Sequence, residues 1–152
     1  METLQPRTGP QEVRILALDV GEKRIGLAVS DPLGITAQGL EVLTRRDPET
    51  DLARLIEVAR QWGVQEIVLG LPRHMDGRPG KAVPEILELG QRLKEALGVK
   101  VATLDERLTT AEAERVLLQA DLSRRRRRQV VDRLAAVLIL QGYLDQRRQS
   151  RP

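Results

Sequence analysis

The run EIVLGLP at residues 66–72 is apolar along almost its whole length, and helical apolar spacing flanks it on both sides. A short apolar run of this kind is typical of a strand buried on both faces, such as a central parallel strand. A strand buried in this way needs a layer of helices packed on its sheet. The chain is therefore expected to form a sheet covered by helices.

Three further strands are predicted before the first helix. Residues 14–20 form an apolar run that ends at Gly21, GEKR predicts a turn, and residues 24–31 return as a second strand. Residues 35–44 are more polar, which favours a strand at the edge of the sheet. The first two strands are therefore predicted to form a hairpin, followed by an edge strand.

The rest of the chain alternates helices and strands. Asp47 before Pro48 predicts a helix start, and Gly63 its end. The order is β-β-β-α-β-α-β-α-α, which predicts an α/β mixed five-stranded sheet with three antiparallel hairpin-linked strands and two parallel strands. The later elements are expected at 84–97 (helix), 100–107 (strand), a helix from Thr109, and a last helix from about Val130 to Arg148.

Composition limits the class of protein. With 41% hydrophobic and 31% charged residues, the chain is globular, and we expect a single domain over 14–148, a flexible arm over 1–13 and a tail over 149–152. No apolar run has the length of a membrane helix, and the first residues lack a secretory signal. The absence of cysteine excludes disulfides and zinc–thiolate sites and fits a cytoplasmic protein.

The excess of arginine among the basic residues has two explanations: it favours a phosphate-bearing partner, or it reflects codon bias. Most of the 25 are arginine, which binds phosphate through a bidentate fork. Trp62 and Tyr143 are the only aromatic residues, so a platform for stacking bases is not available. A nucleic-acid partner would therefore be read through its backbone and shape. The run Arg124–Arg128 is expected to be an exposed linker that adds salt-sensitive affinity.

Acidic residues stand at the ends of two predicted strands and on the last helix. Asp19 ends the first strand, and Asp105 and Glu106 end the fifth; adjacent strand residues face opposite ways, so at most one of these two joins Asp19. Asp132 shares a helical stripe with Ala136. If the fourth strand lies between the first and fifth, the strand-end acids start roughly 10 Å apart. Such an oxygen-rich set would bind Mg²⁺ or Mn²⁺.

Each acid also has a purely structural interpretation. Asp19 could cap the amides of the following turn, since aspartate often bonds to nearby backbone. Asp105 and Glu106 could pair with Arg107, and Asp132 with a neighbouring arginine. These alternatives stay open on spacing alone.

Four blocks of sequence resemble a known family. DVGEKRIGLAVSD, VLGLPRHMDGRPG, LDERLTTAEA and VDRLAAVLILQGYL are similar to the motifs of the YqgF/RuvX family and occur in the family's order. The resemblance implies a ribonuclease-H-like fold and an enzyme that resolves Holliday junctions or matures the 16S rRNA precursor. It also implies that Asp19, Glu106 and Asp132 are the catalytic and metal-binding residues, with Asp105 as the lower-ranked alternative to Glu106.

The resulting hypothesis is a metal-dependent nuclease that processes the 5′ end of precursor 16S rRNA as a monomer or homodimer. Two ions about 3.5–4 Å apart would activate water and stabilise the leaving oxygen. His74 is expected to have a surface-loop role. The alternatives are a Holliday-junction resolvase, a phosphate-binding ATPase and a non-catalytic RNA-binding module. The expected nucleic-acid-binding residues are Lys23, Arg24, Arg73, Arg107, Arg124, Arg125, Arg126, Arg127 and Arg128.

Overall fold

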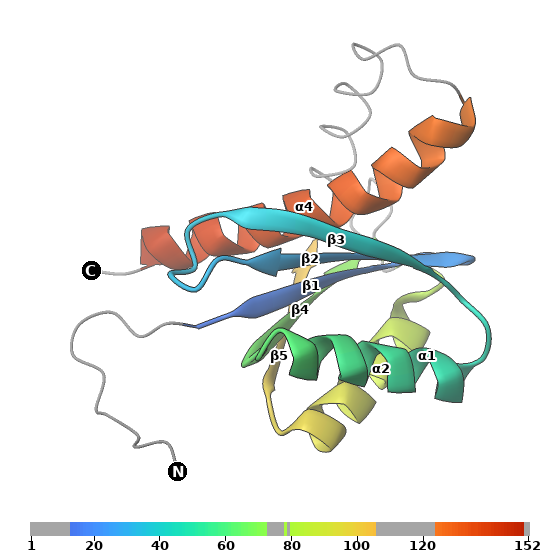
Figure 1. Ribbon diagram of the computed structural model, residues 1–152, viewed down its shortest axis with the longest axis horizontal. Coiled ribbons are helices and arrows are strands. Elements are labelled where there is room, and N and C mark those ends of the chain that lie inside the picture. The colour runs from blue at the N-terminus through green and yellow to red at the C-terminus, as the bar shows by residue number, and fades with distance from the viewer. Residues whose placement is uncertain (1–12, 73–77, 79, 106–123, 151–152) are drawn as a thin grey trace.

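A computed structural model describes residues 13–72, 78, 80–105 and 124–150, with side chains in the last segment for 133–147 (Figure 1). Five strands form one sheet in the order β3-β2-β1-β4-β5. β1 pairs antiparallel with β2, and β2 with β3, whereas β1, β4 and β5 are parallel. The predicted mixed sheet is confirmed, with β3 at an edge. The strands are β1 (Ile15–Val20), β2 (Arg24–Ser30), β3 (Ala37–Thr44), β4 (Glu66–Leu71) and β5 (Lys100–Asp105).

Helices cover both faces of the sheet (Figure 1). α1 (Pro48–Gln61) and α2 (Val83–Leu97) lie on one face, and α4 (Arg124–Ser150) lies on the other. α1 begins where predicted, because the Asp47 carboxylate accepts a hydrogen bond from the Thr50 amide at 2.8 Å. α2 ends at Gly98, whose φ of +67° suits a residue without a side chain.

Two hydrophobic cores follow from the alternation of side chains along the strands. The first, between the sheet and the helices α1 and α2, contains Leu16, Leu18, Ile67 and Leu69. The second core, between the sheet and α4, includes three alanines, Ala17, Ala28 and Ala136. Such small side chains let a helix approach a sheet closely. The buried residues of this second core are Ile15, Ala17, Ala28, Val68, Ala136, Ile139, Leu140, Tyr143 and Leu144.

α4 runs antiparallel to β1. A Cβ atom at Gly39 of β3 would lie 2.7 Å from Cγ of Arg133, and Gln141, further along the helix, donates to the Ile35 carbonyl just before β3. The helix thus runs opposite to β3, and β3 runs parallel to β1 because both are antiparallel to β2. The first turns of α4 therefore lie towards the carboxyl ends of β1, β4 and β5.

The expectation that the arginine run forms a linker is wrong. α4 begins at Arg124, not near Val130, so the five arginines form its first turns. Arginine has high helix propensity, and the apolar segment that follows continues the helix without a break. Despite the length of α4, no helix in the described ranges is both long and apolar enough to span a membrane. The predicted helix from Thr109 and the end of the fifth strand, 106–107, lie outside the described residues.

A buried carboxylate anchors the last part of α4. Glu66, at the start of β4, is 5% exposed and accepts a hydrogen bond from the Tyr143 hydroxyl. Nη1 of Arg147 lies 3.3 Å from the other carboxylate oxygen. Burial and the bond to Glu66 raise the pKa of Tyr143 to about 12. This cluster joins α4 to the sheet at the amino end of β4.

Replacing Tyr143 with phenylalanine should lower the free energy of unfolding by about 1–3 kcal/mol, because Glu66 would lose a buried donor. Since the folded pKa is raised, the bond contributes fully below pH 10 and is lost as the pH rises towards 12. Urea unfolding from pH 7 to pH 12 should show a difference between the two proteins that narrows above pH 10. Equal stability at pH 7 would contradict this role.

Candidate active site

Asp19 is a half-buried carboxylate near the carboxyl end of the central strand. It alternates with Ile15 and Ala17, which pack against α4, so it lies on the α4 face of the sheet. The amide of Gly21 donates to the Arg24 carbonyl at 2.8 Å and closes the turn that follows Asp19.

Glycines lie beside Asp19 in the neighbouring strands. Asp19 pairs with Gly26 of β2. On the other side, Leu18 pairs with Leu69, so continuing the register by one residue places Gly70 of β4 next to Asp19. In a sheet, neighbouring side chains on one face stand about 5 Å apart. Both neighbouring positions are therefore glycine, and neither strand places a side chain directly beside the carboxylate on this face.

Asp105 lies on the opposite face from Asp19. It is paired with Leu71 and alternates with Val101, which packs against the core beneath α1 and α2. β4 separates β1 from β5, as the sequence argument assumed. The sheet itself therefore separates the side chains of Asp19 and Asp105. Glu106 lies outside the described residues, and its role stays a prediction.

The third predicted acid belongs to α4. Position 132 is within the helix, one turn before Ala136, which is fully buried against the sheet. The direction of α4 brings this part of the helix towards the carboxyl end of β1. The side chain of Asp132 is not among those described, so its contact with the other acids stays a prediction.

The predicted basic residues occupy different places. Lys23 is exposed in the turn between β1 and β2. Arg24 alternates with Gly26 and Ala28, which places it on the same face as Asp19. Arg73, His74 and Arg107 lie outside the described residues, and the side chains of Arg124–Arg128 are not described.

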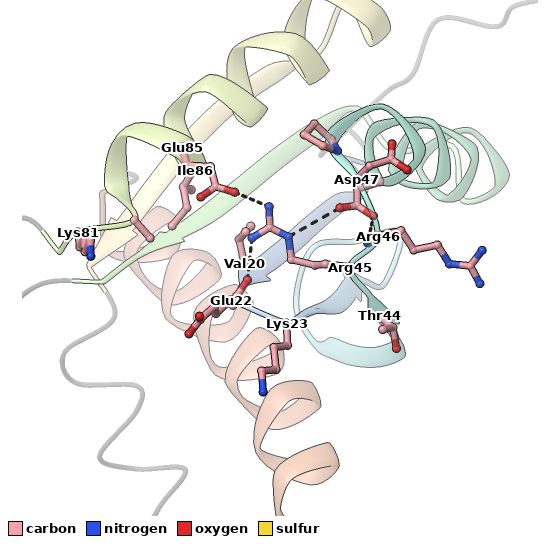
Figure 2. Close-up of a pocket in the computed structure, with 14 residues that line it drawn as sticks. Val20, Glu22, Lys23, Thr44, Arg45, Arg46, Asp47, Lys81, Glu85 and Ile86 are labelled. Atoms are coloured by element: carbon pink, nitrogen blue, oxygen red, sulfur yellow. Dashed lines mark hydrogen bonds and ion pairs between the residues drawn. The ribbon is translucent and has the colours of Figure 1, made fainter.

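A cleft of about 880 Å³ opens at the carboxyl edge of the sheet on the face of α1 and α2 (Figure 2). Three basic residues in it were missed by sequence reasoning: Arg45, Arg46 and Lys81. The only signal was the pair RR directly before the Asp47 cap, which is also common on exposed surfaces. The residues that line the cleft are Val20, Gly21, Glu22, Lys23, Thr44, Arg45, Arg46, Asp47, Pro48, Asp51, Lys81, Ala82, Glu85 and Ile86.

Within the described part of the chain, no three acidic or histidine side chains come together in a group able to hold a metal ion. Two of the three predicted ligands, Glu106 and Asp132, have side chains outside that part. The metal-ligand set thus remains a prediction whose described member is Asp19.

Solved structures of other proteins share this fold. The fold is similar to that of Thermus thermophilus RuvC, solved in complex with a Holliday junction substrate, with a TM-score of 0.60 and 17% identity over 91% of this chain and 97% of that one. The fowlpox virus resolvase, solved with Holliday junction DNA, gives a TM-score of 0.58 and 11% identity over 88% and 98%. The chain therefore has the ribonuclease-H-like fold of the resolvases.

The chain belongs to the RuvX family, described as Holliday junction resolvase, whose family model matches residues 13–146. A relative from Moorella thermoacetica is 56% identical over 88% of this chain and 95% of its own length. Another from Symbiobacterium thermophilum is 56% identical over 89% and 94%. Both are described as "Putative pre-16S rRNA nuclease". The protein is accordingly a hydrolase of the nuclease class, as the sequence predicted.

Replacing Gly21 with alanine should disturb the turn that follows Asp19. A Cβ atom there would lie 2.9 Å from the Arg24 carbonyl oxygen, a backbone atom that cannot move aside without opening the turn. We expect a loss of about 1–3 kcal/mol in the free energy of unfolding, measured by urea denaturation. The control is Glu22→Ala, in an exposed neighbour, which should change stability by less than about 0.5 kcal/mol. Equal effects would contradict the steric argument.

Proposed function

We propose that this protein is a divalent-metal-dependent nuclease that acts in the cytoplasm on the 5′ end of precursor 16S rRNA, in ribosome biogenesis. The description of its relatives supports the substrate. The observation that carries the chemistry is Asp19, a half-buried carboxylate at the end of the central strand with Gly26 and Gly70 beside it. A partly buried carboxylate is costly unless it is paired or coordinates a metal ion, which is consistent with a ligand role for Asp19.

The donor chemistry fits Mg²⁺ or Mn²⁺, which prefer carboxylate oxygens. Asp19, Glu106 and Asp132 would hold the metal. When bound, such ions supply an activated water and stabilise the charge on the leaving oxygen. The protein's own part is to hold these carboxylates in a fixed orientation and to align the phosphate backbone beside them.

Glu106 is a better candidate than Asp105 for the ligand from the fifth strand. Asp105 lies on the face of α1 and α2, whereas Asp19 lies on the face of α4. To share a metal ion with Asp19, the Asp105 side chain would have to reach around the end of the sheet. Strand alternation favours the residue after Asp105 for the α4 face.

Basic residues near this edge would bind the phosphate backbone of the substrate. Arg24 shares the face of Asp19, and Lys23 projects from the adjoining turn. The first turns of α4 add the arginines 124–128, and Arg73 and Arg107 lie within two of the family motifs. Contacts of this type carry affinity without base specificity.

A Holliday-junction resolvase is the second candidate, because the family description names that activity and the fold matches resolvases. A four-way junction calls for two active sites related by symmetry, and hence for a dimer. A non-catalytic RNA-binding module is less suited to this sequence, because a binder of polyanions gains nothing from a carboxylate set.

The test is the substitution Asp19→Asn, measured on precursor rRNA, single-stranded RNA and a four-way DNA junction with Mn²⁺. We expect cleavage of the precursor to fall by at least about a hundredfold while binding of the RNA changes little, since a metal ligand is lost and the basic surface is kept. The matched control is Asp105→Asn, on the other face of the same edge, which should cleave normally. Wild-type cleavage by Asp19→Asn would exclude the metal mechanism, and cleavage of the junction alone would favour the resolvase.

The arginines at the start of α4 can be tested separately. Replacing Arg124–Arg128 with glutamine keeps a residue of high helix propensity but removes five charges. We expect weaker RNA binding and a shallower salt dependence, with the slope of log K against log salt reduced by about 0.7 for each lost single-strand phosphate contact. The maximal rate at saturating substrate should be kept. A lost maximal rate would contradict a role in binding alone.

A further inference from the structure

Arg45 connects the β1–β2 turn with the end of β3. Its backbone amide donates to the Lys23 carbonyl at 2.9 Å. Its side chain reaches the same turn, where Nη1 donates to the Gly21 carbonyl, also at 2.9 Å. A single residue thus binds two of the three residues in the turn that follows the strand of Asp19.

The same guanidinium contacts both helices on that face of the sheet. Nη2 forms an ion pair with Glu85 of α2, and Nε lies 3.7 Å from the Asp51 carboxylate of α1. Figure 2 shows Arg45 at the centre of these contacts, with Glu85 and the turn on one side and α1 on the other. The Arg45 side chain is 21% exposed and that of Asp51 is 6% exposed, so water screens this side of the network poorly.

The anchor of Arg45 on α1 is itself fixed. Asp51 also accepts a hydrogen bond from the Arg46 amide at 3.0 Å. Arginine suits the central position because its planar group offers five donors in a rigid fork. A lysine could keep the positive charge near Asp51 but could not reach the turn and both helices together.

The end of β1 depends on the turn more than the rest of the strand does. Pairing of β1 with β4 extends to Leu18, opposite Leu69, whereas pairing with β2 continues through Asp19 and Val20. Asp19 therefore lies just past the last β1–β4 pair and next to the turn. The geometry of the turn, two residues further on, sets how this end of the strand lies.

We propose that Arg45 is a positioning residue for the metal site, which fixes the turn and with it the orientation of Asp19 from the opposite face of the sheet. This inference rests on the proposed function, since it takes Asp19 as a metal ligand. Residues that orient a ligand from outside the coordination sphere change metal affinity measurably when they are replaced.

A role in stability alone is the competing explanation, and the chain offers a matched control for it. Arg92 of α2 forms an ion pair with Glu49 of α1, with a distance of 2.7 Å from Nη2 to Oε1. This pair joins the same two helices as the Arg45 network but does not involve the turn. If only the packing of the two helices matters, loss of either arginine should weaken Mn²⁺ binding. If the turn positions Asp19, only loss of Arg45 should weaken it.

The experiment is a calorimetric titration of Mn²⁺ into the full-length protein without nucleic acid, with the melting temperature of each metal-free variant recorded in parallel. Arg45→Gln should weaken Mn²⁺ binding by about tenfold, the lower end of what loss of an outer orienting partner causes. Arg45→Lys should give a smaller loss of Mn²⁺ affinity. If Arg45→Gln does not fold, the affinity of Arg45→Lys tests the positioning role in its place. Arg92→Gln should lower the melting temperature and leave Mn²⁺ affinity unchanged.

Wild-type Mn²⁺ affinity in folded Arg45 variants would overturn the positioning role. An equal loss of affinity in Arg92→Gln would overturn it too, because the effect would then follow the helices. The titration also includes Asp19→Asn. If that variant binds Mn²⁺ as the wild type does, the metal site itself is wrong, and this outcome is distinct from failure of the Arg45 proposal.

Discussion

The placement of β1 between β2 and β4 governs the rest of the structure. The strand is buried on both faces from Ile15 to Leu18, so a charged side chain in it would lose its hydration without compensation. Asp19 is tolerated because it comes near the end of the strand, where the sheet opens to an edge. The same edge receives the carboxyl ends of β4 and β5 and the first half of α4. The burial of β1 thereby leaves this edge as the place in the strand where a carboxylate is tolerated.

Much of this arrangement was accessible from the sequence. The apolar run at 66–72 predicted a central parallel strand, and the Asp47–Pro48 pair predicted the start of α1; both are confirmed. These features depend on local chemistry, namely side-chain burial and amide capping. The face of Asp19 was also predictable, since strand alternation is strictly local.

Other features depend on contacts between residues distant in sequence, and local patterns do not encode them. The extension of α4 back to Arg124 was missed because a run of like charges is usually read as a solvated linker. Arg45 was missed because the three partners of its side chain, Gly21, Asp51 and Glu85, come from separate elements. The metal-ligand set is implied by family resemblance for Asp19, Glu106 and Asp132, and only the first has a described side chain.

The unbroken course of α4 has a consequence for substrate geometry. Tyr143 and Leu144 are buried and pack the later turns of α4 against the sheet. The first turns carry Arg124–Arg128. At 1.5 Å per residue, those arginines stand about 6–12 Å along the helix axis from position 132. A flexible tether would allow that separation to vary, whereas a helix holds it constant. If Asp132 binds the metal as proposed, α4 would hold the site of hydrolysis at a constant distance from the arginines that bind the substrate.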